Sequence, residues 1–159
     1  MKKIIFLFLI FSGVVFAKWE VGTSYDTGDN PTTTFTTYDL EEGYSYITIG
    51  VNIQSLGYSM VTVFCEDIEK GDNLVLIVTD NDGSDITCRF LEDDIEDYVI
   101  RMPAGRSTVL TKMLYNGKSA VLINRKKDEI LATFDLSGIK QVMKKHVGSS
   151  YWYKYKLND

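Results

Sequence analysis

A single histidine limits the nucleophilic and metal chemistry that this chain can perform. His146 is the only histidine among the 159 residues, so a Ser-His-Asp or Cys-His catalytic site, or a histidine-based zinc site, would have to use it. It follows Lys144 and Lys145 near the expected end of a helix, where a partly charged imidazole complements the helix dipole. We therefore expect a structural role for His146, with no catalytic residue and no cofactor.

Carboxylates, which can act as general acids and bases, are numerous in the middle of the chain. The segment 66–97 contains twelve acids, and its only bases are Lys70 and Arg89. Glycosidases use a pair of acids at a set separation, yet no spacing in this segment singles out two of them. An envelope hydrolase with paired carboxylates is therefore an alternative to a non-enzymatic protein.

Asp80, Asp82 and Asp85 resemble the beginning of a calcium-binding loop. Counted from Asp80, the glycine is fourth, at Gly83, although an EF-hand needs it sixth, and Leu91 occupies the position of the bidentate glutamate. Asn and Asp beside glycine are typical of a tight turn. The run therefore predicts a hairpin turn, with weak calcium binding as the alternative and no other metal site.

The C-terminal residues form the densest aromatic group of the chain. In an extended strand, Tyr151, Tyr153 and Tyr155 would share one face, with Trp152 on the other. Tyrosine and tryptophan are enriched at binding hot spots, so we name Tyr151, Trp152, Tyr153 and Tyr155 as the candidate binding residues. The alternative is a closing strand whose tyrosines cover the edge of the core.

The cysteine pair, Cys65 and Cys88, predicts a disulfide if the chain is exported, because disulfides persist in oxidising compartments. Two buried, unpaired thiols are the alternative. On two strands that flank a common neighbour, the cysteines would lie about 9.6 Å apart, and a bridge needs Cα atoms within about 7 Å. A bond would therefore require a sheet crossover, a strong bend or a two-sheet sandwich.

The N-terminus has the pattern of a bacterial secretion signal. Lys2 and Lys3 precede an apolar stretch, and residues 15–17 place small residues at the −3 and −1 positions of a peptidase site. The stretch is shorter than the roughly 17 to 25 residues of a membrane-spanning helix. We therefore expect residues 1–17 to be a signal peptide, cleaved after Ala17. Because Lys18 and not cysteine follows, we expect no lipid anchor and a periplasmic or secreted protein.

The remaining residues, 18–159, are expected to form a single β-rich domain, since a chain of this size can enclose one hydrophobic core. With 45% hydrophobic and 25% charged residues, the composition is typical of a globular protein. The net charge is −5, and −7 without Lys2 and Lys3. Nucleic acid and anionic lipid surfaces are therefore not expected as partners.

A period of two dominates the chain from Trp19 onward. The clearest core stripe is Ile47, Ile49, Val51 and Ile53, which alternates with Tyr46, Thr48 and Gly50. Seven strands are expected at short spacing, which favours a mainly β fold with two short helices, an antiparallel β-sandwich or a partly open barrel. They cover residues 19–25, 32–39, 47–53, 58–65, 73–79, 86–91 and 98–102.

The last third of the chain predicts two helices and a hairpin. A helix is expected over residues 107–116, with Ser107 as a possible cap and Gly117 at its end. Strands over 118–124 and 130–135 flank a polar turn and form a hairpin. A second helix begins near Ser137, with an apolar face of Ile139, Val142, Met143 and Val147, and ends at Gly148.

The chain contains the run Phe-Asp-Leu-Ser-Gly at residues 134–138, Trp19 near its start, the strand 60–65 and a helix before the basic strand 118–125. In these features it resembles the TagO/VasI family of type VI secretion-associated envelope proteins. Invasion-associated locus B proteins have a similar look. The resemblance implies a small secreted β-rich accessory domain. The family commonly has a cysteine after the last helix, where this chain reads His-Val-Gly-Ser at 146–149, so a disulfide pairing is not carried over from the resemblance.

The same run is a fold motif on physical grounds. Phe134 and Leu136 alternate inward at a strand end, and Gly138 allows close packing where strand turns into helix. The G-x-S-x-G spacing of a serine nucleophile elbow is absent. The expected function is thus a non-enzymatic binding or accessory protein of the bacterial cell envelope, whose partner is an envelope protein or a cell-wall component. A host-directed inhibitor or adhesin is a further alternative, and the sequence indicates no oligomeric state.

Overall fold

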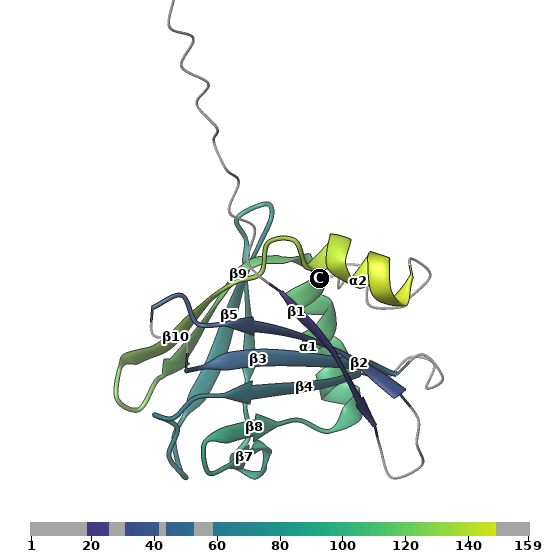
Figure 1. Cartoon of the computed structure of the whole chain (residues 1–159). Coiled ribbons are helices and arrows are strands. Elements are labelled where there is room, and N and C mark those ends of the chain that lie inside the picture. Colours follow the sequence, from purple (N-terminus) through teal and green to yellow (C-terminus); the bar gives the residue numbers. More distant parts are fainter. Residues whose placement is uncertain (1–18, 26–30, 42–43, 53–58, 149–159) are drawn as a thin grey trace, which may run out of the picture.

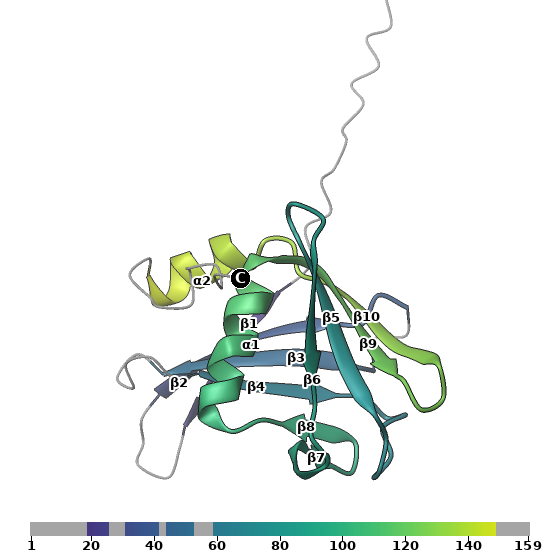
Figure 2. The same cartoon turned by 180° about the vertical axis from the view of Figure 1, so that it is seen from behind.

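The computed structural model describes residues 19–25, 31–41, 44–52 and 59–148. This part of the chain folds into two antiparallel sheets with two α-helices, as Figures 1 and 2 show from opposite sides. The fold is therefore mainly β and is not a closed barrel, which confirms the expected β-sandwich. The expected signal peptide, its cleavage site at Ala17 and the aromatic tail from Tyr151 to Tyr155 lie outside the described residues.

Each sheet combines strands from distant parts of the chain. The first sheet contains, in spatial order, β1 (Glu20–Tyr25), β2 (Pro31–Tyr38), β3 (Tyr46–Asn52), β4 (Ser59–Phe64), β8 (Val99–Arg101) and β7 (Ile95–Glu96). The second sheet contains β10 (Glu129–Asp135), β9 (Gly117–Asn124), β5 (Leu74–Asp80) and β6 (Asp85–Arg89). The remaining elements are η1 (Glu92–Asp94), α1 (Ala104–Asn116) and α2 (Ile139–Val147).

The hydrophobic core lies between the two sheets and is closed by the helices. Ile47, Ile49 and Val51 of β3 are buried, and the residues between them point to the opposite face, so the predicted core stripe is confirmed over the described residues. Burying such side chains contributes about 1.5 to 3 kcal/mol each. The same core includes Phe35, Val61, Leu76, Leu122, Phe134 and Met143.

Helix α1 takes the place of a neighbouring strand along part of β4. Strand β8 pairs only with residues 62–64 of β4, so among the described residues the first half of β4 has no strand on the side opposite β3. The backbone N–H of Val61 donates to Ser107 Oγ instead, and Ser59 Oγ bonds Thr111 Oγ1. The expectation that Ser107 caps the helix is therefore wrong. The helix begins at Ala104, after Pro103, whose missing N–H costs nothing at a helix start.

The run at residues 134–138 joins the last strand to the last helix. Phe134 and Leu136 are fully buried, and the Asp135 carboxylate accepts from the Ser137 N–H at 2.8 Å. Gly138, with φ of 84°, adopts the left-handed conformation that precedes α2. The fold-motif prediction is confirmed, and Gly138 occupies the N-cap position of α2. The indole N–H of Trp19 donates to the Ser137 carbonyl at 3.1 Å.

The predicted bond between Cys65 and Cys88 is absent, and both thiols are free. Cys65 directly follows β4 of the first sheet and is buried, whereas Cys88 lies on β6 of the second sheet and is half-buried. Cys65 belongs to the hydrophobic core, whereas the Cys88 side chain lines a pocket between β6 and α1. The two thiols thus lie in different surroundings on different sheets and are not bonded.

In the part of the chain that the structure describes, no helix is both long and apolar enough to cross a membrane.

Candidate functional site

The outward face of the first sheet presents three aromatic rings side by side, which we call the aromatic row: Tyr38, Tyr46 and Phe64. They lie directly opposite one another on β2, β3 and β4. The rings of Tyr46 and Phe64 are stacked at 5.0 Å between centroids with an interplanar angle of 11°, and Tyr38 meets Tyr46 edge-on at 6.1 Å. The three rings form a continuous aromatic surface across three strands.

A row of hydroxyl groups runs beside the aromatic row on the same face. Thr36, Thr48 and Thr62 lie opposite one another, two residues along each strand from an aromatic ring. The Oγ1 atoms of Thr36 and Thr48 are 2.9 Å apart and hydrogen-bonded. We call this the hydroxyl row. Because each hydroxyl has one donor and two acceptor positions, the row keeps hydrogen-bonding capacity for a ligand.

Strand alternation places these side chains outward. Their neighbours in sequence, such as Thr37, Ile47 and Val63, are buried on the other face, and threonine and aromatic residues suit a half-buried pleated surface. On β2, β3 and β4 none of the described outward-facing residues is charged. Among the described strands of this sheet, charges occur only on the flanking strands, where for example Arg101 of β8 pairs with Glu96 of β7 at 3.1 Å.

Tyr38 is held in place by a charge on the edge strand. Its hydroxyl donates to Glu20 Oε2 of β1 at 2.9 Å. This hydrogen bond, with smaller contributions from burial and the negative charge of Glu20, raises the pKa of Tyr38 above the usual value for tyrosine. The phenol therefore stays neutral at every physiological pH, and the aromatic row presents uncharged rings.

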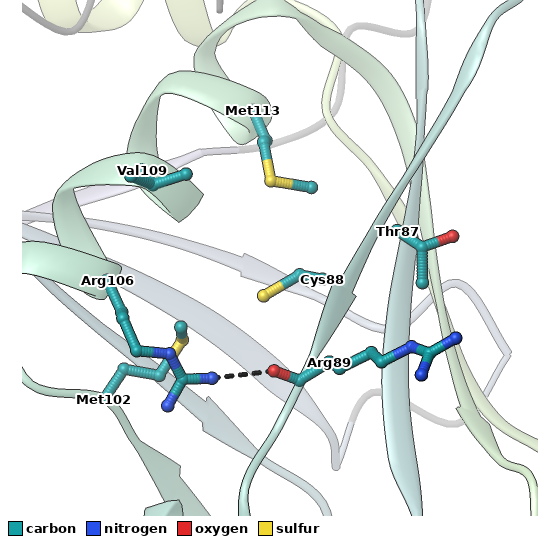
Figure 3. A pocket seen from close by; sticks show the side chains of 7 residues that line it. All are labelled: Thr87, Cys88, Arg89, Met102, Arg106, Val109 and Met113. Carbon is teal, nitrogen blue, oxygen red and sulfur yellow. Dashed lines mark hydrogen bonds between the residues drawn. The ribbon is translucent and has the colours of Figure 1, made fainter.

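A second feature is a pocket of about 260 Å³ between β6 and α1 (Figure 3). Cys88 points into it from β6 and Met113 from α1, and Arg106 crosses one end. Arg106 Nη1 contacts both carboxylate oxygens of Asp94, and Nη2 donates to the Arg89 carbonyl at 2.7 Å. Burial raises the pKa of the Cys88 thiol, although the charge of Arg106 opposes the shift. Cys88 is therefore a protonated, weakly nucleophilic thiol at neutral pH.

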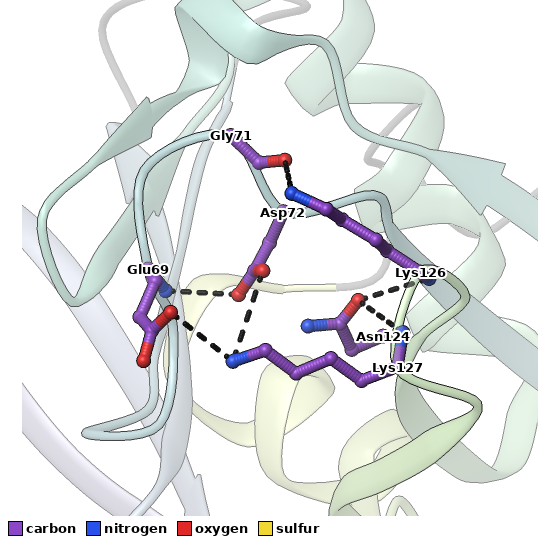
Figure 4. Close-up of polar contacts among 6 residues, drawn as sticks. All are labelled: Glu69, Gly71, Asp72, Asn124, Lys126 and Lys127. Carbon is purple, nitrogen blue, oxygen red and sulfur yellow. Dashed lines mark hydrogen bonds and ion pairs between the residues drawn. The ribbon is translucent and has the colours of Figure 1, made fainter.

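A third feature is a polar cluster that connects two loops (Figure 4). Lys127, from the β9–β10 turn, lies 3.2 Å from Glu69 and 3.9 Å from Asp72. Burial acts to raise the pKa of Asp72, but the hydrogen bond from the Glu69 N–H at 2.9 Å, the nearby Asn124 amide, and the charges of Lys127 and Lys126 outweigh it and lower the pKa. The cluster fastens the loop before β5 to the β9–β10 hairpin, which is a structural role.

The remaining acids of the segment 66–97 are dispersed rather than gathered. Asp80 Oδ1 accepts the backbone N–H groups of Asp82 and Ser84, and Asp85 Oδ1 accepts from Thr79 Oγ1. Strands β5 and β6 pair around this turn, so the hairpin prediction is confirmed. Within the described ranges, no three His, Cys, Asp or Glu side chains converge as metal ligands.

The sequence did not point to the aromatic row as a binding surface. Its members come from three strands, and only the strand pairing brings them together. The available signal was the alternation of Tyr46 and Thr48 with the buried isoleucines of β3. His146 lies in the last turn of α2 beside Lys144 and Lys145, as expected, and its ring packs edge-on against Phe35 at 6.4 Å.

Comparisons with protein-family models, with curated proteins and with solved structures found no match to this chain.

Proposed function

We propose that this protein is a secreted or periplasmic, non-enzymatic binding protein of the bacterial cell envelope, and that the outward face of its first sheet binds a neutral cell-wall glycan. The leader-like residues 1–17 support the location. The resemblance to the TagO/VasI family supports an accessory role, including one beside a secretion system. The proposal for the surface rests on the geometry of the face itself.

The observation that carries the proposal is the aromatic row beside the hydroxyl row. The apolar faces of sugar rings stack on aromatic side chains, and their hydroxyls exchange hydrogen bonds with groups such as Thr48 and Thr62. The absence of charge on the described outward positions of β2 to β4 suits an uncharged ligand, even though the whole chain has a net charge of −5. An extended glycan could lie across several strands of such a face.

The experiment compares two tyrosine variants in a binding assay with purified, insoluble cell-wall polysaccharide. Tyr46→Ala removes the central ring of the aromatic row, and we expect a loss of about 2 kcal/mol or more, which is more than tenfold in affinity. Tyr25→Ala is the matched control, because Tyr25 is an exposed tyrosine of the same sheet that pairs with Pro31 outside the aromatic row. Melting temperatures of both variants separate lost binding from lost folding.

Four outcomes overturn the proposal. If the wild-type protein does not bind the polysaccharide, the glycan is excluded as the ligand. If the two variants bind equally well, the aromatic row is excluded as the binding surface. Envelope fractions can also be treated before the protein is added. If the protein still binds fractions whose glycan has been digested but not fractions whose proteins have been digested, the partner is a protein. Release of soluble sugar products by the wild-type protein would instead establish the hydrolase alternative.

A further inference from the structure

Strand β6 forms an open edge of the second sheet. Among the described residues it pairs with β5 alone, and its side chains alternate between exposed and half-buried. Asp85, Thr87 and Arg89 are the exposed ones. An edge strand of this kind presents unpaired N–H and C=O groups that can pair with another strand. The question is which strand fits it.

The register determines which backbone groups face outward. The Phe90 N–H donates to the Leu74 carbonyl, and the Asp80 N–H donates to the Ser84 carbonyl, so in this antiparallel pair the even-numbered residues of β6 hydrogen-bond with β5. The odd-numbered residues, Asp85, Thr87 and Arg89, must therefore direct their backbone groups away from β5. The Arg89 carbonyl confirms this direction, because it accepts from Arg106 Nη2 on α1.

These three residues are complementary to themselves. When a strand pairs antiparallel with its own copy about a twofold axis at Thr87, each Thr87 faces the partner's Thr87, and each Asp85 faces the partner's Arg89. Opposite charges directly across a strand pair are favourable, and like charges are unfavourable. A one-step or two-step slip of the register would lose both Asp–Arg pairs.

We propose that two copies of this chain associate through antiparallel pairing of β6 with β6, centred on Thr87. The two four-stranded sheets then become one continuous eight-stranded sheet, and the interface is of the self-complementary type that twofold dimers use. The second lone pair of the Arg89 carbonyl remains available for the partner, because a carbonyl oxygen can accept two hydrogen bonds.

The length of the pairing is limited by the chain itself. Phe90 is buried and its N–H is bonded to Leu74, so β6 leaves the sheet edge after Arg89. At the other end, Asp80 closes the hairpin turn by binding Ser84. The exposed Val109 of α1 lines the groove beside β6 and can contact the partner. A short pairing of this kind predicts an equilibrium between monomer and dimer.

The first test is a charge exchange, followed by sedimentation velocity over a dilution series of the full mature chain. Wild-type protein should show a concentration-dependent dimer. Asp85→Arg and Arg89→Asp should each weaken association at least about tenfold, because each places like charges opposite one another. The double variant Asp85→Arg/Arg89→Asp restores opposite charges and should recover the dimer. Glu129→Arg is the control, with the same charge change on β10 at the far edge of the sheet.

The second test checks the register by oxidative cross-linking. Directly opposed residues of a hydrogen-bonded pair have Cα atoms about 5.5 Å apart, which a disulfide can span. Thr87→Cys should therefore give a covalent dimer. Asp85→Cys should not, because its symmetry mate lies four residues further along, roughly 13 Å away.

Wild-type protein that stays monomeric at every concentration overturns the proposal. A dimer that survives both single charge reversals, or that Asp85→Cys traps as readily as Thr87→Cys, shows that the copies meet through another surface or in another register. A double variant that stays monomeric while its melting temperature matches wild type also contradicts the proposal.

Discussion

Arg106 holds a carboxylate that is almost completely withdrawn from water. Its Nη1 lies 2.8 Å and 2.6 Å from the two oxygens of Asp94, whose side chain is 3% exposed, while that of Arg106 is 34% exposed. Asp94 also accepts from the Leu91 N–H at 2.7 Å. Helix α1 is thereby fastened to η1, and through the Arg89 carbonyl to β6.

Removing Arg106 should destabilise the protein strongly. Arg106→Leu leaves the buried Asp94 without its counter-charge, and we expect a loss of about 3 kcal/mol, the low end for a buried pair because water reaches the guanidinium. Urea unfolding measures the loss. The matched control is Arg101→Leu, whose pair with Glu96 is about two-thirds exposed on both sides and should contribute less than about 1 kcal/mol. Equal losses would contradict the assignment of Asp94 as a buried charge.

A carboxylate on the core face of β3 should be far more damaging than one on the opposite face. Ile49→Asp buries an unpaired charge and should cost several kcal/mol, on the order of a third of the stability of a typical domain. Tyr46→Asp removes part of a stacked ring pair on the half-exposed outward face and should cost much less. Denaturant titration of both variants measures the two losses of stability. Similar unfolding midpoints for the two variants would mean that the outward face of β3 is also covered.

Asp72 should make stability depend on pH in the acid range. Its pKa is lowered in the folded protein, so the folded state binds its proton less readily than the unfolded state. The contribution is fully present above the unfolded pKa of about 3.9 and is lost as the pH falls through the folded pKa. Thermal unfolding across pH 2–7 should therefore show a smaller acid loss for Asp72→Asn than for wild type. If the melting temperatures of wild type and Asp72→Asn fall equally with pH, the charge of Asp72 does not stabilise the folded protein through this cluster.

Both cysteines should be free thiols of low reactivity. Burial encloses Cys65 and raises the pKa of Cys88, so neither should react quickly with an alkylating reagent at neutral pH. Intact mass spectrometry of protein unfolded without reductant should show two alkyl groups. A mass that shows none, with two appearing only after reduction, would establish the disulfide that the structure lacks.

The local patterns of the sequence predicted most strands because alternation is a local property. Ile47, Ile49 and Val51 identify both the strand and its buried face without any knowledge of partners. Strand β7 and the turn η1 were missed because they are too short to show a period, and they depend on the contact between Asp94 and Arg106. Ser107 was misassigned because a serine beside an apolar face suits both a helix cap and a buried hydrogen bond.

The candidate site could not be predicted because it depends on register. Tyr38, Tyr46 and Phe64 become neighbours only when two strand pairs adopt one of several possible alignments. Cys65 and Cys88 illustrate the same limit, since the number of cysteines does not show which sheet holds each of them. The calcium-like run was read correctly as a turn because its glycine spacing is a local feature.

The hydrogen bond from Trp19 to Ser137 spans 118 positions of the chain, and Thr37 reaches the Asp135 carbonyl across 98 positions. The earliest strands are thus completed by some of the latest residues. Chains dominated by such distant contacts fold slowly, because a large loop must close before the contacts stabilise anything. A nascent chain that stops short of residue 137 therefore lacks the acceptor that holds its first tryptophan, and folding should be a late, nearly all-or-none event after synthesis.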